Sequence, residues 1–320
     1  MATATLDRPA SPFIARARPL APEKFRDPEW TAKGEPRAHV APERLETLWL
    51  NTGTLCNLAC ASCYIESSPR NDALVYLLLA EAERYLDEAA VMGPRTIGFT
   101  GGEPFMNPHM LAMMEAALGR GFDLLILTNA MQPMRRFATR LAAFAADEKA
   151  RIVMRVSLDH HSGAMHEAER GTGTWAKALD GLRWLEQAGF PTAVAGRQLP
   201  GETAEDARMG YAALFAEERL EVCEGVVIFP PMDETADVPE ISDACWGILG
   251  QSPSAMMCAS SRMVVKHRGA AAPHVVACTL IPYDPGFAMG RTLAEAWRPI
   301  ALNHPHCAKF CVLGGASCSG

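Results

Sequence analysis

The strongest constraint on how this chain folds is a regular alternation of strand-like and helix-like segments between residues 45 and 231. Short apolar segments predict strands at 45–52, 95–100, 122–129, 151–159, 191–196 and 224–231. Apolar residues at three- and four-residue spacing predict helices at 77–93, 109–121, 134–148, 174–189 and 204–218. Such alternation is typical of parallel βαβ units. We therefore expect an α/β fold, a partial (β/α)6 TIM-like barrel that stays open, with functional residues on loops at the carboxyl ends of its strands.

The alternation stops after residue 231, and this divides the chain into three parts. Residues 1–44 are rich in Pro, Arg and Ala and have no steady period, so we expect a loosely attached N-terminal arm. Residues 45–235 form the predicted barrel domain. Residues 236–320 hold six of the ten cysteines and predict a small C-terminal cysteine-rich domain.

Charge and hydropathy exclude several classes of partner. The net charge of −7 provides no basic surface, so neither nucleic acid nor an anionic membrane is the expected partner. The N-terminus has no apolar core of a secretory signal, and no apolar run reaches the roughly 18 to 20 residues of a membrane span. We expect a soluble, cytoplasmic protein. Since disulfides rarely persist in that compartment, its clustered thiols indicate metal ligation.

The first cysteine cluster lies on the loop after the first predicted strand. Cys56, Cys60 and Cys63 have C-x3-C-x2-C spacing, which lets three thiolates hold three corners of a 4Fe–4S cluster. The fourth iron then lacks a protein ligand and can chelate a small molecule. A structural zinc site is the alternative, although such sites normally recruit four ligands in paired knuckles.

The run CNLACASCY after a predicted strand resembles the signature of the radical S-adenosylmethionine (SAM) superfamily. The resemblance implies that the three cysteines hold a 4Fe–4S cluster whose open iron binds the methionine part of SAM. It also implies reductive cleavage of SAM to a 5′-deoxyadenosyl radical, and an electron donor of the flavodoxin or ferredoxin type. The position before the third cysteine is often aromatic in that family and here is Ser62, so Tyr64 is the expected ring contact with adenine.

A glycine turn follows the second predicted strand as Gly101, Gly102, Glu103 and Pro104. Glycines let the backbone approach a ligand closely, and a glutamate can accept from an ammonium group. Taken alone, the turn is equally a sharp loop. One βα unit after the cysteine run, it resembles the GGEP motif of the same family, which contacts the amino group of SAM.

Polar residues end the next two predicted strands. Asn129 ends the third, and Ser157 and Asp159 end the fourth, where the family carries a polar residue for the ribose of SAM. The alternative is that these residues cap helices or begin turns. Residues 166–173 resemble an H-x-x-x-R-G-x-G stretch of relatives with an auxiliary cluster. Arg170 is therefore a candidate for binding a carboxylate of SAM or substrate, or else for pairing with a neighbouring loop.

Five cysteines lie within the 61 residues from Cys258 to Cys318. Their arrangement resembles the SPASM/twitch extension of radical SAM enzymes, which implies one auxiliary 4Fe–4S cluster in residues 236–320. The expected ligands are Cys258, Cys278, Cys307 and Cys311, with Cys318 as an alternative fourth ligand or a free thiol. Zinc remains the alternative metal, and it would have a structural role only.

Two cysteines remain outside the clusters. Burial in the core is the default for Cys223 and Cys245, since free cysteines are among the most buried residues. The sharper hypothesis is that Cys223, on the sixth predicted strand, donates a hydrogen atom to a substrate radical, as in epimerases of this superfamily.

Taken together, these patterns predict a radical SAM oxidoreductase or maturase that abstracts hydrogen from a small-molecule or peptide substrate, with a net oxidation or rearrangement. No peptide-leader-binding domain is evident in residues 1–44, which slightly favours a small molecule. The alternatives are an iron–sulfur electron-transfer protein without SAM chemistry and a zinc-stabilised binding module.

Overall fold

The computed structural model describes residues 10–14, 18–231, 233 and 235–315. Its centre is a sheet with the strand order β10-β9-β8-β2-β3-β4-β5-β6-β7. Six neighbouring strands pair in parallel and in chain order, which is the open barrel expected from the alternation. They are β2 (Thr47–Asn51), β3 (Thr96–Thr100), β4 (Asp123–Thr128), β5 (Ile152–Ser157), β6 (Thr192–Arg197) and β7 (Val226–Phe229).

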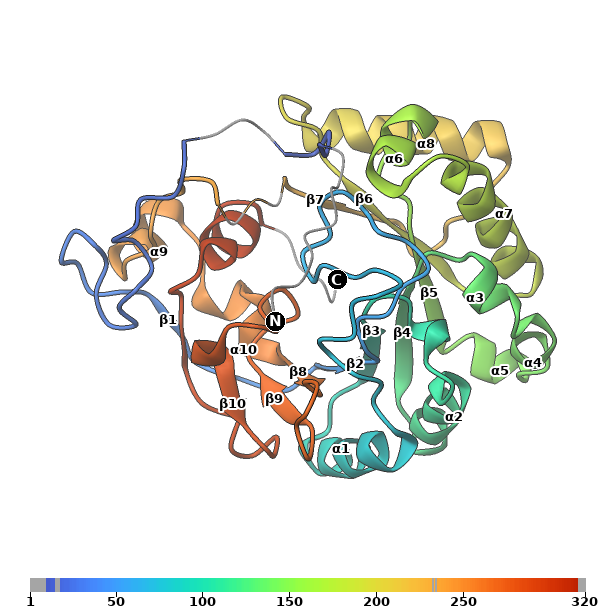
Figure 1. Cartoon of the computed structure of the whole chain (residues 1–320), viewed down its shortest axis with the longest axis horizontal. Coiled ribbons are helices and arrows are strands. Elements are labelled where there is room, and N and C mark those ends of the chain that lie inside the picture. Colours follow the sequence, from blue (N-terminus) through green and yellow to red (C-terminus); the bar gives the residue numbers. More distant parts are fainter. Residues whose placement is uncertain (1–9, 15–17, 232, 234, 316–320) are drawn as a thin grey trace.

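Helices follow the strands and cover the outer side of the curved sheet, as Figure 1 shows. They are α1 (Leu79–Met92), α2 (Met110–Gly119), α3 (Gln132–Arg135), α4 (Ala138–Ala142), α5 (Ala146–Lys149), α6 (Gly163–Arg170), α7 (Thr174–Gln187) and α8 (Ala204–Glu218). The single helix expected over 134–148 is three short helices, because Ala145 is extended with a ψ of 156° and Phe137 leaves helical geometry with a ψ of 9°.

The barrel strands are packed closely from both faces. Every residue of β2 is buried, and the indole of Trp49 has no solvent exposure. Its neighbour in β3 is Gly98, where a Cβ atom would lie 2.3 Å from the Trp49 ring. Gly98 is thus the residue that makes room for this large side chain, because a 2.3 Å contact between carbons is far below van der Waals separation.

The C-terminal region extends the same sheet across the expected boundary near residue 235. Strand β8 (Ser261–Val265) pairs in parallel with β2, and β9 (His274–Val276) and β10 (Ala288–Gly290) follow in antiparallel order. The remaining elements are α9 (Ala244–Leu249), α10 (Met257–Ser260), β11 (Ile300–Ala301), the 3-10 helices η1 (Pro104–Met106), η2 (Pro253–Ala255) and η3 (Pro285–Phe287), and the π-helix η4 (Cys307–Val312).

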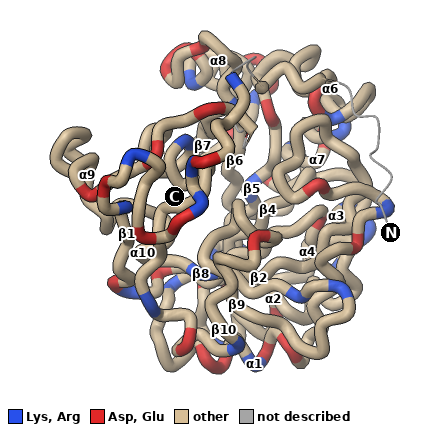
Figure 2. Tube along the Cα trace, turned by 60° about the vertical axis from the view of Figure 1, so that its left-hand side comes forward, with Lys and Arg blue, Asp and Glu red and all other residues tan. Residues whose placement is uncertain are grey.

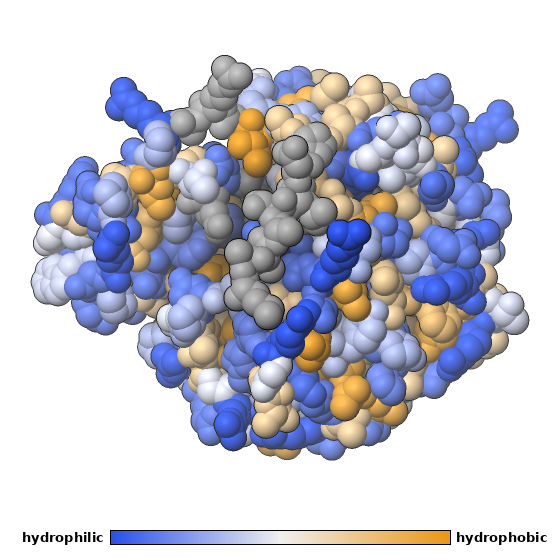
Figure 3. Space-filling view, viewed as in Figure 1, coloured by the Kyte–Doolittle hydropathy of each residue, from blue (hydrophilic) through white to orange (hydrophobic). Residues whose placement is uncertain are grey.

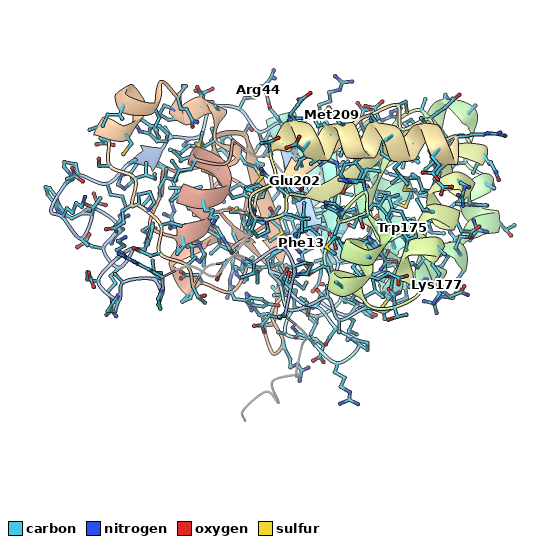
Figure 4. All side chains as sticks on the ribbon, turned by 90° about the horizontal axis from the view of Figure 1, so that it is seen from above. Phe13, Arg44, Trp175, Lys177, Glu202 and Met209 are labelled. Carbon is cyan, nitrogen blue, oxygen red and sulfur yellow. The ribbon has the colours of Figure 1, made fainter. Side chains whose placement is uncertain are left out.

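The expectation of a loosely attached arm is wrong for its described residues. Strand β1 (His39–Val40) pairs with β11, and the fully buried Arg37 forms an ion pair of 2.5 Å with Glu240. Phe13 has no solvent exposure, and Figure 4 labels it near the centre of the molecule. Composition did not predict this docking because a few anchoring residues, not a periodic pattern, hold the segment.

Charged, polar and apolar residues lie interspersed on the surface. Acidic and basic positions are interspersed in the view of Figure 2, and exposed apolar residues are scattered among hydrophilic ones in Figure 3. Across the described residues, no helix has both the length and the apolar character that a membrane crossing requires.

Candidate functional site

A cavity lies at the carboxyl ends of the barrel strands, where the parallel fold collects strand-end residues. Most of the site residues predicted from the sequence line this one cavity. They are Cys56, Cys60, Cys63, Tyr64, Gly101, Gly102, Asn129, Ser157, Asp159 and Arg170. The structure therefore brings together residues that lie more than a hundred positions apart in the chain.

The three cysteines lie on the loop after β2, and backbone groups already point at two of them. The amide of Leu58 lies 3.4 Å from the Sγ of Cys56, and the amide of Ser67 lies 3.3 Å from the Sγ of Cys63. Burial raises the pKa of the Cys56 thiol to about 12 and that of Cys60 to about 11. Metal ligation at these thiols therefore releases protons and is favoured by rising pH.

A group of described side chains outside the cysteine loop has the spacing of a site for a single metal ion. A tetrahedral zinc with bonds of roughly 2.3 Å brings its sulfur ligands to about 3.8 Å from one another. Among the described residues, the only three candidate ligand atoms within 4.8 Å of one another belong to His160, His161 and Glu202. There the Nδ1 of His160 accepts from the Ser162 amide, so its Nε2 carries the proton and faces Glu202 at 3.3 Å. The thiols of Cys56, Cys60 and Cys63 are not part of this group.

The glycine turn after β3 packs directly against the cysteine loop. A Cβ atom at Gly101, which has a φ of +141°, would lie 2.5 Å from the carbonyl oxygen of Gly53. At Gly102 it would lie 2.3 Å from the carbonyl oxygen of Leu55. The amide of Gly102 donates to Gly53 and that of Glu103 donates to Leu55. Only glycines permit this backbone contact, which fixes the turn to the start of the cysteine loop.

Glu103 lies behind the cavity wall and is 1% exposed. Its carboxylate accepts from the Oγ1 of Thr128 at 2.9 Å and from the amide of Asn129 at 2.8 Å. Asn129 in turn donates to Asn57 in the cysteine loop. Burial raises the pKa of Glu103 to about 7, despite the hydrogen bonds that favour its ionised form. Pro104 is buried beside it and begins the helix η1.

Asp159 and Arg170 form a buried bidentate pair. The Nε and Nη2 atoms of Arg170 donate to the two carboxylate oxygens of Asp159 at 2.6 and 3.1 Å. Burial alone would raise the pKa of Asp159, but Arg170 and Arg197 hold it below its ordinary value. The pairing with a neighbouring loop is thus observed, and both partners still line the cavity beside Ser157.

Ser62, Glu169 and Arg197 also line the cavity, and the sequence did not indicate them as site residues. The carboxylate of Glu169 accepts from the amide of Ser62 at 2.8 Å and from its hydroxyl at 2.9 Å. The guanidinium of Arg197 lies 3.1 Å from the same carboxylate and donates to the Ser62 hydroxyl at 2.8 Å. The signal available was weak: Arg197 ends the fifth barrel strand, and Glu169 adjoins Arg170.

A second, smaller cavity lies in the C-terminal region. Four thiols converge on it, and its other lining residues are apolar apart from His306. Those thiols belong to Cys258, Cys278, Cys307 and Cys311. Burial raises the pKa of the Cys258 thiol to about 11 and that of Cys307 to about 12. Cys318 lies outside the described residues.

The two cavities share a wall. The side chain of Leu280 lines both, and its amide lies 3.4 Å from the Sγ of Cys278. Phe310, between Cys307 and Cys311, lines the first cavity, and its ring is tilted by 41° to that of Phe229 with the ring centroids 5.3 Å apart. One layer of side chains thus separates the barrel cavity from the four-cysteine cavity.

The structure does not bring Cys223 to the site. This thiol is exposed, lies before β7, and has its Sγ 3.9 Å from the carbonyl oxygen of Thr192, the first residue of β6. That position is at the amino ends of the strands, opposite the cavity. The hydrogen-donor hypothesis for Cys223 is therefore wrong in this structure, because the strand's carboxyl end and not its start faces the site. Cys245 lies in α9 and is half-buried.

Comparison with known proteins gives matches of two kinds. The curated relatives include the antilisterial bacteriocin subtilosin biosynthesis protein AlbA of Bacillus subtilis, 28% identical over 141 residues, covering 44% of this chain and 30% of AlbA. The mycofactocin maturase MftC of Mycobacterium tuberculosis is 30% identical over 135 residues, covering 42% of this chain and 33% of MftC. The match thus spans about a third of each relative.

A solved structure with the same fold is that of Streptococcus suis SuiB bound to its precursor peptide SuiA. It aligns with a TM-score of 0.59 at 12% identity, covering 80% of this chain and 65% of SuiB. The model of the radical SAM superfamily matches residues 50–209, which is half of the 320-residue chain and includes the cysteine loop, the glycine turn and strands β3 to β6. The chain therefore belongs to the radical SAM superfamily, whose enzymes use SAM together with a 4Fe–4S cluster.

Proposed function

We propose that this chain is a radical SAM maturase that abstracts a hydrogen atom from a peptide substrate and carries a second, auxiliary iron–sulfur cluster. Cys56, Cys60 and Cys63 hold the SAM-binding 4Fe–4S cluster in this proposal. When bound, that cluster supplies the electron that cleaves SAM to methionine and a 5′-deoxyadenosyl radical. A carrier of the flavodoxin or ferredoxin type is the proposed source of the electron.

The observation that carries the proposal is the single cavity that three thiols share with the glycine turn and the polar strand ends. The thiols ligate metal, while Asn129, Ser157 and the Asp159–Arg170 pair provide donors and acceptors for a polar ligand. An electron-transfer protein has no need of such a space beside its cluster. The arrangement therefore favours SAM chemistry over electron transfer alone.

The residues of the cavity have distinct proposed roles. The guanidinium of Arg170 already pairs with Asp159. Its remaining N–H donors and the electric field of the Arg170–Asp159 pair orient the carboxylate of SAM. From behind the cavity wall, Glu103 keeps Asn129 in place by accepting a hydrogen bond from its amide, and its negative charge, when ionised, favours an ammonium group of SAM in the cavity. Tyr64 provides a ring at the cavity wall next to the third cysteine, and is the proposed contact for adenine.

The four-cysteine cavity is the proposed site of the auxiliary cluster. Four thiols suffice for a cluster without an open iron, which mainly moves electrons. Leu280 and Phe310 separate this site from the barrel cavity by one side-chain layer. A substrate in the barrel cavity can therefore pass an electron to the auxiliary cluster, which makes the net reaction an oxidation.

A peptide is the favoured substrate class. AlbA acts in bacteriocin biosynthesis, MftC is a maturase, and SuiB binds a precursor peptide. These relatives reverse the slight preference for a small molecule that residues 1–44 suggested.

The test is anaerobic reconstitution of the full chain with iron and sulfide, followed by reduction with dithionite in the presence of SAM. We expect about eight irons per chain, from two 4Fe–4S clusters, and release of 5′-deoxyadenosine and methionine. Eight irons without SAM cleavage would support the electron-transfer alternative instead. Bound zinc without sulfide would support the binding module. Deuterium transfer to 5′-deoxyadenosine from deuterated peptides, but not from free amino acids, would support the substrate class.

A further inference from the structure

The N-terminal segment around Ser11 lies against the cysteine loop, although 51 residues separate Ser11 from Ser62. In Figure 1 this dark-blue segment lies beside α6 and β6. The hydroxyl of Ser11 donates to the carboxylate of Glu169 at 2.5 Å and lies 3.1 Å from the hydroxyl of Ser62. The segment thus contacts the loop that carries Cys60 and Cys63.

Glu169 is the centre of this contact. It is 2% exposed, and its carboxylate accepts from Ser11, from the amide of Ser62 and from the Ser62 hydroxyl. Its backbone carbonyl accepts from the amide of Ala61 at 2.8 Å. Two consecutive amides between the second and third cysteines are therefore bound to one residue of α6.

Arg197 and Phe13 complete the arrangement. Arg197 neutralises Glu169 at 3.1 Å and donates to Ser62, so the buried carboxylate has both a counter-charge and hydrogen bonds. The guanidinium of Arg197 lies 4.9 Å from the centroid of the Phe13 ring, and Phe13 is fully buried. The amide of Phe13 also donates to the Ser11 hydroxyl. The aromatic anchor therefore holds Ser11 within reach of Glu169.

We propose that Ser11, Phe13, Glu169 and Arg197 form an N-terminal clamp that positions the backbone between Cys60 and Cys63 for cluster and SAM binding. The inference rests on the proposed function for its link to SAM, but not for the contacts themselves. Ser62 occupies the position where relatives often carry an aromatic residue, and here its short hydroxyl is what the clamp holds. These four are positioning residues, since they act through the loop.

The test measures amide hydrogen exchange across residues 57–65 in the metal-free full chain. In Ser11→Ala, the loss of one hydrogen bond should raise the exchange rate of this segment about fivefold. In Glu169→Gln, the loss of the charge-assisted hydrogen bonds from Ser11 and Ser62 should raise the exchange rate by at least about tenfold. Ser11→Thr keeps the hydroxyl and should restore the parental rate. Ser252→Ala, which removes an exposed serine hydroxyl in the C-terminal region, is the matched control.

A second measurement separates positioning from general stability. In the reconstituted full chain, Ser11→Ala should raise the SAM dissociation constant about fivefold while exchange in β3 and β4 stays at the parental rate. Parental exchange over 57–65 in both Ser11→Ala and Glu169→Gln would overturn the clamp. Faster exchange with an unchanged dissociation constant would overturn its link to SAM. The exchange measurement needs neither cluster nor SAM, so it tests the clamp even if the proposed function is wrong. Failure of the proposed function would show separately, as a parent protein that does not cleave SAM.

Discussion

The two cysteine-lined cavities of this protein differ in the side chains that surround their thiols. In the barrel cavity, three cysteines face Asp159, Glu169, Arg170 and Arg197, together with the polar ends of the strands. In the C-terminal cavity, four cysteines face Leu, Ile, Met and Phe side chains and His306. None of the described residues that line the C-terminal cavity carries a carboxylate or a guanidinium.

Under the proposed function, this difference separates a site for radical chemistry from a site for electron transfer. Three thiols leave one iron open, and the charged wall provides partners for the polar groups of a ligand on that iron. Four thiols in an apolar surround leave no open iron and nothing to orient a polar ligand. Hydrogen bonding and solvent exposure at cluster sulfurs set reduction potential, so the two sites are also expected to differ in redox behaviour.

The largest expected effect comes from removing the three-cysteine site. Replacing Cys56, Cys60 and Cys63 together by Ala should reduce SAM cleavage to background, because no other described residues offer an open iron beside the polar cavity. Iron should fall by about four per chain while the C-terminal site keeps its share. Iron analysis and 5′-deoxyadenosine release measure both. Parental cleavage in this variant would overturn the contrast between the cavities.

The converse variant tests the other cavity. Replacing Cys278 and Cys307 by Ala should again remove about four irons per chain, but SAM cleavage should persist because the barrel site performs it. Turnover of the peptide substrate should fail, because the substrate radical would have no electron acceptor. Iron content is measured beside 5′-deoxyadenosine yield. An iron content equal to the parent's would show that the C-terminal cavity holds no cluster.

The charged wall of the barrel cavity is expected to contribute to stability as well as to binding. Arg170→Ala leaves the buried carboxylate of Asp159 without its bidentate partner, which should cost about 3–5 kcal/mol of unfolding free energy. Urea denaturation measures the loss. The control is Arg140→Ala, whose exposed pair with Glu115 should contribute less than about 1 kcal/mol. Equal losses in the two variants would contradict the buried pair's role.

A smaller effect is expected at Glu103. Glu103→Ala removes the charge-assisted partner proposed for the ammonium group, so SAM should bind about 10- to 100-fold more weakly. Thr128→Val removes a single hydrogen bond to the same carboxylate and serves as the matched control. Titration of the cluster spectrum with SAM gives both dissociation constants. If Thr128→Val weakens binding as much as Glu103→Ala, the glutamate acts only by holding its neighbours.

The smallest effect is a pH dependence confined to the barrel cavity. Burial raises the pKa of Glu103 to about 7, so below that pH the free protein carries a proton on this carboxyl. That proton must leave before an ammonium group can pair with it. The SAM dissociation constant should therefore rise as pH falls below 7, by up to about tenfold per unit, and level off above 7. Glu103→Gln should remove this pH dependence of the dissociation constant. A pH dependence that remains in Glu103→Gln would belong to another titrating group.

The sequence by itself determined the open barrel, the cysteine loop and the glycine turn. The 2.0 and 3.6 periodicities are local properties of the chain, and each motif lies within a few residues of its own strand end. It also identified four C-terminal cysteines that line one cavity, because cysteines that lie close together in a sequence stand out by type. It did not resolve residues 134–148 into three helices, since tertiary packing overrides propensity there.

Only the tertiary structure decided which charged side chains face one another. The Glu169–Arg197 pair spans two βα units, and Ser11 reaches Glu169 across 158 positions, so no local pattern marks either contact. Cys223 is a different case: the sequence already places it at the start of the sixth predicted strand, whereas the site of a parallel barrel lies at the opposite, carboxyl end. Side-chain burial and pairing depend on which segments the fold brings together. A charged residue in sequence is therefore exposed by default until the packing of distant segments places it inside.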